Sequence, residues 1–202
     1  MKAIESFFLR ARHWQLFLLL FCTQLLGPKL LTIVRTFVAP GPGLDAAGLV
    51  GKILAAFGIV CWVAWIGSIG TFFNRLNQPS KRGPARFFQF TLAYTALYMV
   101  ALDVFLSNAS PLISASGAHP IGTFATLNFY FTLPLVAILC AFYAFYFAAK
   151  SLVMVQSPGP VGFRDYAGPM LMIWFFPAGL WFIQPGINRL YAQLKDSHAA
   201  TS

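Results

Sequence analysis

Charge is scarce in this sequence. Of its 202 residues only 9% are charged and 58% are hydrophobic, whereas ordinary soluble domains carry about 25% charged residues. A water-soluble surface cannot be built from such a composition. Because each membrane span takes about 20 residues, little of the chain is left for a separate soluble domain. We therefore expect the chain to fold within a lipid bilayer.

Acidic residues are scarcer than basic ones. The sequence has 14 Lys and Arg against 5 Asp and Glu, a formal charge of +9. In a soluble protein this excess would suggest nucleic-acid binding, but the basic residues here lie in short segments beside apolar runs, as orientation signals do. This placement excludes nucleic acid as a partner and favours membrane lipids with anionic headgroups. Membrane-protein partners or a homo-oligomer are the alternatives.

Several residues and motifs that carry chemistry are few or missing. Cys22, Cys61 and Cys140 each lie alone in an apolar run, so no pair has the spacing of a metal site or a disulfide framework. The three histidines lie outside the apolar runs, which excludes a haem held by histidines within the spans. The sequence contains no phosphate-binding glycine loop, His/Glu metal motif or serine elbow. We therefore predict no catalytic residue, metal or cofactor.

Long apolar runs are what the sequence does contain, and they predict an all-α fold. Residues 1–202 form one transmembrane domain, a polytopic helix bundle of four or five spans. The predicted spans are 14–34, 53–73, 87–107, 124–149 and 166–187. The last run contains Pro169, Pro177 and Pro185, so it is either one kinked span or a re-entrant hairpin that turns at Pro177-Ala-Gly179. Its length favours the kinked span.

The loops indicate the orientation, because cytoplasmic segments of membrane proteins collect Lys and Arg. A cytoplasmic N-terminus puts nine of them inside, at positions 2, 10, 12, 75, 81, 82, 86, 150 and 164, whereas loop 108–123 on the other side has none. Five full spans would leave Arg189 and Lys195 outside, against this rule. The motif Asn74-Arg75-Leu76 closes the second run, and Asn188-Arg189-Leu190 closes the last. This repeat also favours a cytoplasmic C-terminus.

Asp103 is the only carboxylate inside an apolar run. Ionisable groups at membrane depth usually face the bundle interior or a wet cavity. The predicted topology puts Asp103 near the outer end of the third span, level with Lys29, Arg35 and Lys52. These four residues are the predicted polar cluster or ion site. Two roles stay open for Asp103: an ion-paired carboxylate that fixes helix packing, and a binding site for a proton or another cation.

Four motifs resemble those of a group of small bacterial polytopic inner-membrane proteins. They are His13-Trp-Gln-Leu-Phe17, Trp65-Ile-Gly-Ser-Ile-Gly70, Phe147-Ala-Ala-Lys150 and Trp174-Phe-Phe-Pro-Ala-Gly-Leu-Trp-Phe-Ile-Gln-Pro-Gly-Ile-Asn188. The resemblance implies a bacterial inner-membrane protein of four or five helices, and it brings no known activity, substrate or catalytic residue. Gly186 departs from the group, in which a basic residue is expected at that place.

Three classes of function follow from these patterns. The leading class is a non-enzymatic membrane protein that associates with lipid or with other membrane subunits, because few polar groups lie within the spans. The second is a carrier of small solutes or ions that uses Asp103 and the proline-broken helices. The third is an intramembrane enzyme, which would require at least two polar side chains that converge in a cavity at membrane depth.

Overall fold

The computed structural model describes residues 2–23, 42–77, 82–116, 124–157, 159–176 and 178–199. Within these residues every regular element is a helix, which confirms the all-α class. Three helices are long and apolar enough to cross a membrane, at Leu49–Leu76, Ala85–Phe105 and Thr132–Gln156, as expected of a membrane protein. The count of four or five spans is not confirmed in this part of the chain. The first expected span, 14–34, lies partly outside the described residues.

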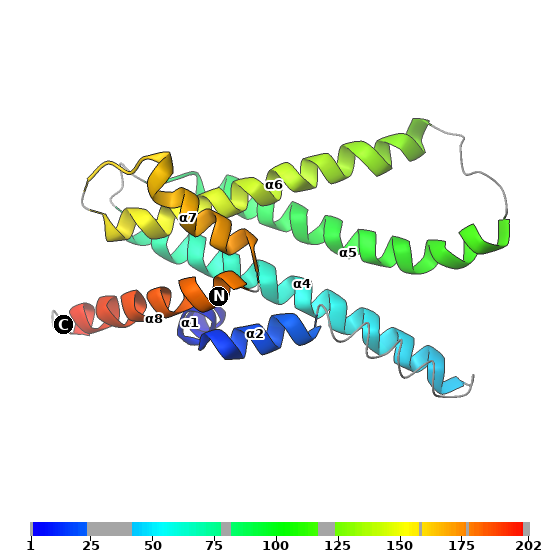
Figure 1. The fold of residues 1–202 in the computed structure, drawn as a ribbon, viewed down its shortest axis with the longest axis horizontal. Coiled ribbons are helices and arrows are strands. Elements are labelled where there is room, and N and C mark those ends of the chain that lie inside the picture. The colour runs from blue at the N-terminus through cyan, green and yellow to red at the C-terminus, as the bar shows by residue number, and fades with distance from the viewer. Residues whose placement is uncertain are drawn as a thin grey trace.

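Three long helices form the body of the molecule: α4 (Pro42–Leu76), α5 (Ala85–Ser116) and α6 (Phe124–Gln156). Each contains one of the uncharged or nearly uncharged apolar runs. In a membrane such a segment has no water to bond its backbone, and a helix satisfies each N–H and C=O within the segment. α4 and α6 run in the same direction and α5 runs in the opposite one (Figure 1).

The long helices pack closely at the end where α4 finishes and α5 begins, called here the packed end. Phe88 of α5 stacks on Phe147 of α6 with ring centroids 4.3 Å apart. The ring of Phe88 also lies so close to Gly70 of α4 that a Cβ there would overlap it. Asn74 fixes the α4–α5 loop, because its Oδ1 accepts a hydrogen bond from the backbone N–H of Gly83 at 2.9 Å. Small residues and side-chain amides therefore hold this end together.

The last apolar run, 166–187, is divided between two antiparallel helices, α7 (Phe163–Trp174) and α8 (Ala178–Ala199). α7 runs along α6 in the opposite direction, and α8 returns toward the packed end, where its Tyr191 ring contacts Phe72 of α4 (Figure 1). Gly179 lies against the backbone carbonyl of Met172, where no side chain fits. The run thus forms a helical hairpin in the structure, whereas its length favoured one kinked helix.

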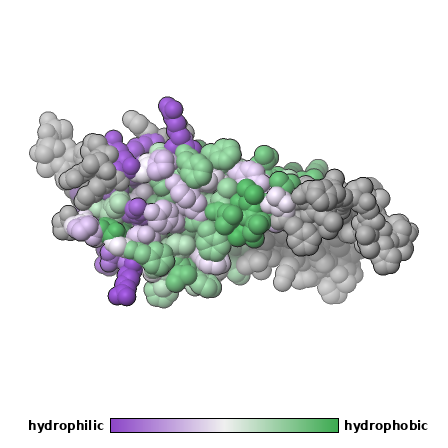
Figure 2. All heavy atoms as spheres, turned by 90° about the horizontal axis from the view of Figure 1, so that it is seen from above, coloured by the Kyte–Doolittle hydropathy of each residue, from purple (hydrophilic) through white to green (hydrophobic). Residues whose placement is uncertain are grey.

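Two short N-terminal helices, α1 (Lys2–Arg10) and α2 (His13–Phe21), pack against α4 and α8. α1 lies across the packed end and buries Phe8 and Leu9 there. Hydrophilic residues gather at this end of the molecule, and hydrophobic ones cover its middle (Figure 2). The packed end is therefore both the polar end and the place where the segments most distant in sequence meet.

Candidate functional site: an apolar cavity at the hairpin tip

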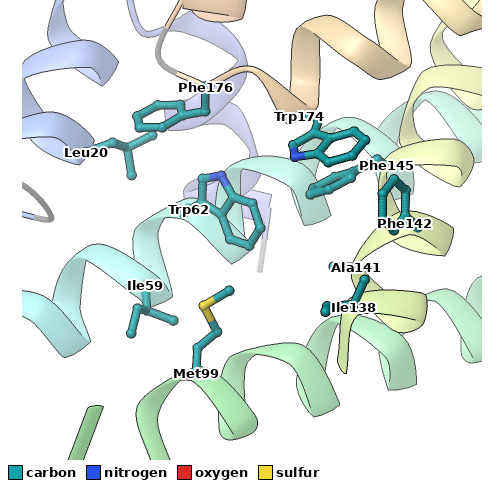
Figure 3. A pocket seen from close by; sticks show the side chains of 10 residues that line it. All are labelled: Leu20, Ile59, Trp62, Met99, Ile138, Ala141, Phe142, Phe145, Trp174 and Phe176. Atoms are coloured by element: carbon teal, nitrogen blue, oxygen red, sulfur yellow. The ribbon is translucent and has the colours of Figure 1, made fainter. Parts of the chain in front are cut away.

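A cavity of about 550 Å³ lies where the turn between α7 and α8 meets the middle of the three long helices (Figure 3). Its size falls within the range of about 300–1,000 Å³ that is usual for ligand pockets. The long helices, α2 and the hairpin turn all contribute to its lining. The lining residues are Leu20, Ile59, Trp62, Met99, Ile138, Ala141, Phe142, Phe145, Trp174 and Phe176.

The lining is almost entirely hydrocarbon. Apart from the sulfur of Met99, the only polar side-chain atoms among the ten lining residues are the indole nitrogens of Trp62 and Trp174. The described lining residues offer no charged group, hydroxyl or amide that would orient a polar substrate, as ligand pockets for such molecules require. The cavity is therefore suited to an apolar ligand.

Aromatic contacts fix the hairpin tip beside the cavity. Trp174 meets Phe142 of α6 edge to face, with ring centroids 4.4 Å apart. On the other side, the ring of Phe176 lies 6.5 Å from that of Trp65 in α4. Well-oriented aromatic pairs contribute about 0.5–1.5 kcal/mol each beyond the area they bury. The tip thus bridges α4 and α6 and covers one side of the cavity.

A buried glutamine, Gln184, anchors α8 just after the hairpin turn. Its side chain is 0% exposed, and its Oε1 accepts a hydrogen bond from the indole N–H of Trp65 at 3.0 Å. Its Nε2 donates to the carbonyls of Phe8 at 2.9 Å and Ala11 at 3.1 Å. Asn188, one turn later, donates to the Ala11 carbonyl at 3.2 Å. These carbonyls lie at the end of α1, where a helix leaves its last C=O groups without internal partners. The Gln184 amide therefore joins α8 both to α4 and to the α1–α2 turn.

Beyond the cavity the three long helices diverge, and their apolar side chains are exposed (Figure 1). Val104 of α5 is 48% exposed, Leu135 of α6 is 58% exposed and Leu49 of α4 is 60% exposed. Soluble monomers rarely expose large contiguous apolar patches. This splayed half therefore requires hydrocarbon or another apolar surface beside it.

The structure describes two of the four residues of the predicted polar cluster. Lys29 and Arg35 lie outside the described residues, Lys52 is exposed on α4, and Asp103 is half-buried on α5. Asp103 follows the cavity-lining Met99 by four residues, and such residues share a helix face. It thus lies one turn beyond the edge of the cavity, and the cluster of four stays a prediction.

Gln184 and Asn188 were not among the predicted site residues. Gln184 is the only side-chain amide within residues 166–187, and Asn188 follows it by four residues, on the same helix face. An unpaired amide in such an apolar run costs free energy, so a partner was to be expected. The sequence therefore indicated that Gln184 has a hydrogen-bond partner. It could not indicate which one, because the partners are backbone carbonyls more than 170 residues away in sequence.

No protein-family model, curated protein or solved structure matches the chain. In the part of the chain that the structure describes, no group of three His, Cys, Asp or Glu side chains is placed to hold a metal ion.

Proposed function

We propose that the chain is a non-enzymatic, multi-pass protein of the bacterial inner membrane that holds the hydrocarbon chain of a lipid in the cavity at the hairpin tip. The observation that carries this proposal is the hydrocarbon-lined cavity in the middle of three helices long enough to cross a membrane. Empty, it would deprive its lining of dispersion contacts, which a lipid chain restores. The resemblance to small bacterial membrane proteins supports the cellular location.

The distribution of basic residues supports a cytoplasmic position for the packed end. Arg75 lies at the end of α4 and Arg82 in the α4–α5 loop, and α8, which contains Arg189, returns toward them (Figure 1). Cytoplasmic segments are enriched in such residues. If the hairpin enters and leaves the membrane on this side, both termini lie in the cytoplasm. Arg189 then lies on the cytoplasmic side, whereas five full spans would put it outside.

Labelling of a cysteine introduced at Ser197 tests this topology. The native cysteines are first replaced by alanine, and Ser197→Cys is then exposed to a membrane-impermeant maleimide in intact cells. We expect labelling only after lysis, whereas Ala118→Cys, in the loop predicted to face outward, is labelled in intact cells. Labelling of both positions before lysis would mean that the C-terminus lies outside and that the hairpin does not re-enter.

A cavity-filling substitution tests the lipid. Ala141→Leu places an isopropyl group in the cavity, and Leu139→Phe enlarges an exposed side chain of the same helix as a matched control. Native mass spectrometry of the purified protein in mild detergent counts the retained lipids. We expect Ala141→Leu to lose a lipid that the wild type and Leu139→Phe retain. Equal retention of lipid by the three proteins would show that the lipid does not bind in the cavity.

A carrier is the second candidate, and two observations favour it. The hairpin tip ends at the middle of α4 and α6, as in transporters built from broken helices, and half-buried Asp103 lies one turn beyond the cavity-lining Met99. In proteoliposomes with an internal pH dye, a carrier of protons loses its flux in Asp103→Asn but not in Asp196→Asn. If Asp103 is structural, Asp103→Asn instead has a lower yield and melting temperature, and the wild type itself shows no proton flux.

A further inference from the structure

A second depression, of about 310 Å³, lies at the packed end between α1, α4 and α8. Its lining includes Glu5, Leu9, Phe72, Arg75, Leu76 and Tyr191. The guanidinium carbon of Arg10 lies over the ring of Tyr191, 5.7 Å from its centroid, in a cation–π contact. The depression thus combines an apolar floor with one guanidinium group and one carboxylate, and the guanidinium of Arg10 lies beside it on the Tyr191 ring.

Arg75 is the group in the depression that can bind an anion. Glu5 is mostly buried, with 12% of its side chain exposed, whereas the Arg75 side chain is 56% exposed. The contact between Arg75 Nη1 and Glu5 Oε2 is 3.4 Å long, compared with about 2.7–2.9 Å for a strong charge-assisted hydrogen bond. A guanidinium carries five N–H donors, so this single contact leaves donors of Arg75 for a ligand.

The position of the depression fits a lipid headgroup. Arg75 stands in the last turn of α4, where the apolar run ends. On α1 beside it, Ile4 is 58% exposed and Phe7 is 56% exposed, as in amphipathic helices that lie in a membrane interface. Basic pockets between membrane helices on the cytoplasmic side bind the headgroups of anionic phospholipids.

From this geometry we infer that the depression binds the phosphate of an anionic phospholipid of the cytoplasmic leaflet, with Arg10 and Arg75 as its ligands. Glu5 holds Arg75 in place and at the same time competes with the phosphate for it. The inference rests on the proposed membrane orientation, but it concerns a different site from the cavity at the hairpin tip, which Ala141→Leu tests separately.

Opposite effects of two substitutions test the site. The full chain in mild detergent is titrated with phosphatidylglycerol or with phosphatidylcholine of the same acyl chains, and bound lipid is counted by native mass spectrometry. We expect Arg75→Gln to weaken phosphatidylglycerol binding about tenfold, because a hydrogen bond to a charged group is lost. Glu5→Gln strengthens it about fivefold, since a carboxylate near the phosphate is removed. Arg164→Gln, which removes an exposed arginine of α7 outside the depression, leaves the binding unchanged.

Each other result would overturn the inference. Equal weakening by Arg75→Gln and Arg164→Gln would indicate general attraction to anionic lipid. Weaker lipid binding by Glu5→Gln would mean that the Glu5–Arg75 pair only stabilises the fold. Displacement of the lipid by equimolar inorganic phosphate would mean that the site binds free phosphate. If Arg75→Gln does not fold, Arg10→Gln takes its place, with the same expected weakening.

Discussion

The two halves of the molecule are made of similarly apolar helices but are packed in different ways. At the packed end, buried polar side chains such as Gln184, Asn74 and Thr91 bond to backbone carbonyls, N–H groups or other side chains. In the splayed half, Leu49 and Leu135 are largely exposed. Hydrocarbon is no better buried against another helix than against lipid tails, so hydrophobicity alone does not bring membrane helices together.

The difference shows that amides and close backbone contacts define the packing of this chain. Among the described residues, every buried side-chain nitrogen and oxygen has a hydrogen-bond partner. Such bonds specify one arrangement, because a displaced amide leaves its partners unpaired in an apolar environment. A cavity lies where the two halves meet. Three pairs of substitutions sharpen the comparison.

Gln184→Leu is expected to have the largest effect. It leaves the indole N–H of Trp65 and the carbonyls of Phe8 and Ala11 without this partner, and each buried unsatisfied group costs about 1–3 kcal/mol. We expect a loss of about 4 kcal/mol in the free energy of unfolding, measured by denaturation in detergent. Gln193→Leu, an exposed position of the same helix, is the control and changes the stability little. Similar losses for both variants would contradict an anchoring role for Gln184.

Gly179→Ala is expected to have the next largest effect. Its Cβ would overlap the carbonyl oxygen of Met172, a backbone atom that cannot rotate away, so the hairpin must open at a cost of about 3 kcal/mol. Gly186→Ala lies on the same helix with no atom within 4 Å of the added Cβ, and it should stabilise the protein by about 0.5–1 kcal/mol. Thermal melting of the two variants compares them. A neutral Gly179→Ala would argue against the close contact between α7 and α8.

Replacement of an alanine by leucine on either side of the boundary between the halves is expected to have the smallest effect on stability. Ala144 is 1% exposed in the packed half, so Ala144→Leu overpacks it and costs about 2 kcal/mol. Ala141→Leu, one turn earlier on α6, enters the cavity and leaves the melting temperature nearly unchanged. Equal destabilisation by both substitutions would mean that the cavity is not open space.

The long helices could be predicted from the sequence because their signal is local. The runs 53–73, 87–107 and 124–149 fall within α4, α5 and α6, although the helices extend beyond them at both ends or at one. The run 166–187 was ambiguous, since a turn at Pro177-Ala-Gly179 and a kink use the same residues. The predicted cluster around Asp103 stays a prediction, and the cavity was not predicted, because no lining residue is unusual in its own segment.

The sequence by itself determined the helical class, the apolar character of the long helices and the basic residues that mark one end. Each of these follows from the composition of a continuous segment, which is read without knowledge of its neighbours. Only the tertiary structure decided that α7 and α8 form a hairpin, that Gln184 bonds to the end of α1, and that the helices leave a cavity between them. These features depend on contacts between segments far apart in the chain. Because hydrophobic residues pack as well against lipid as against one another, their pattern alone could not specify those contacts.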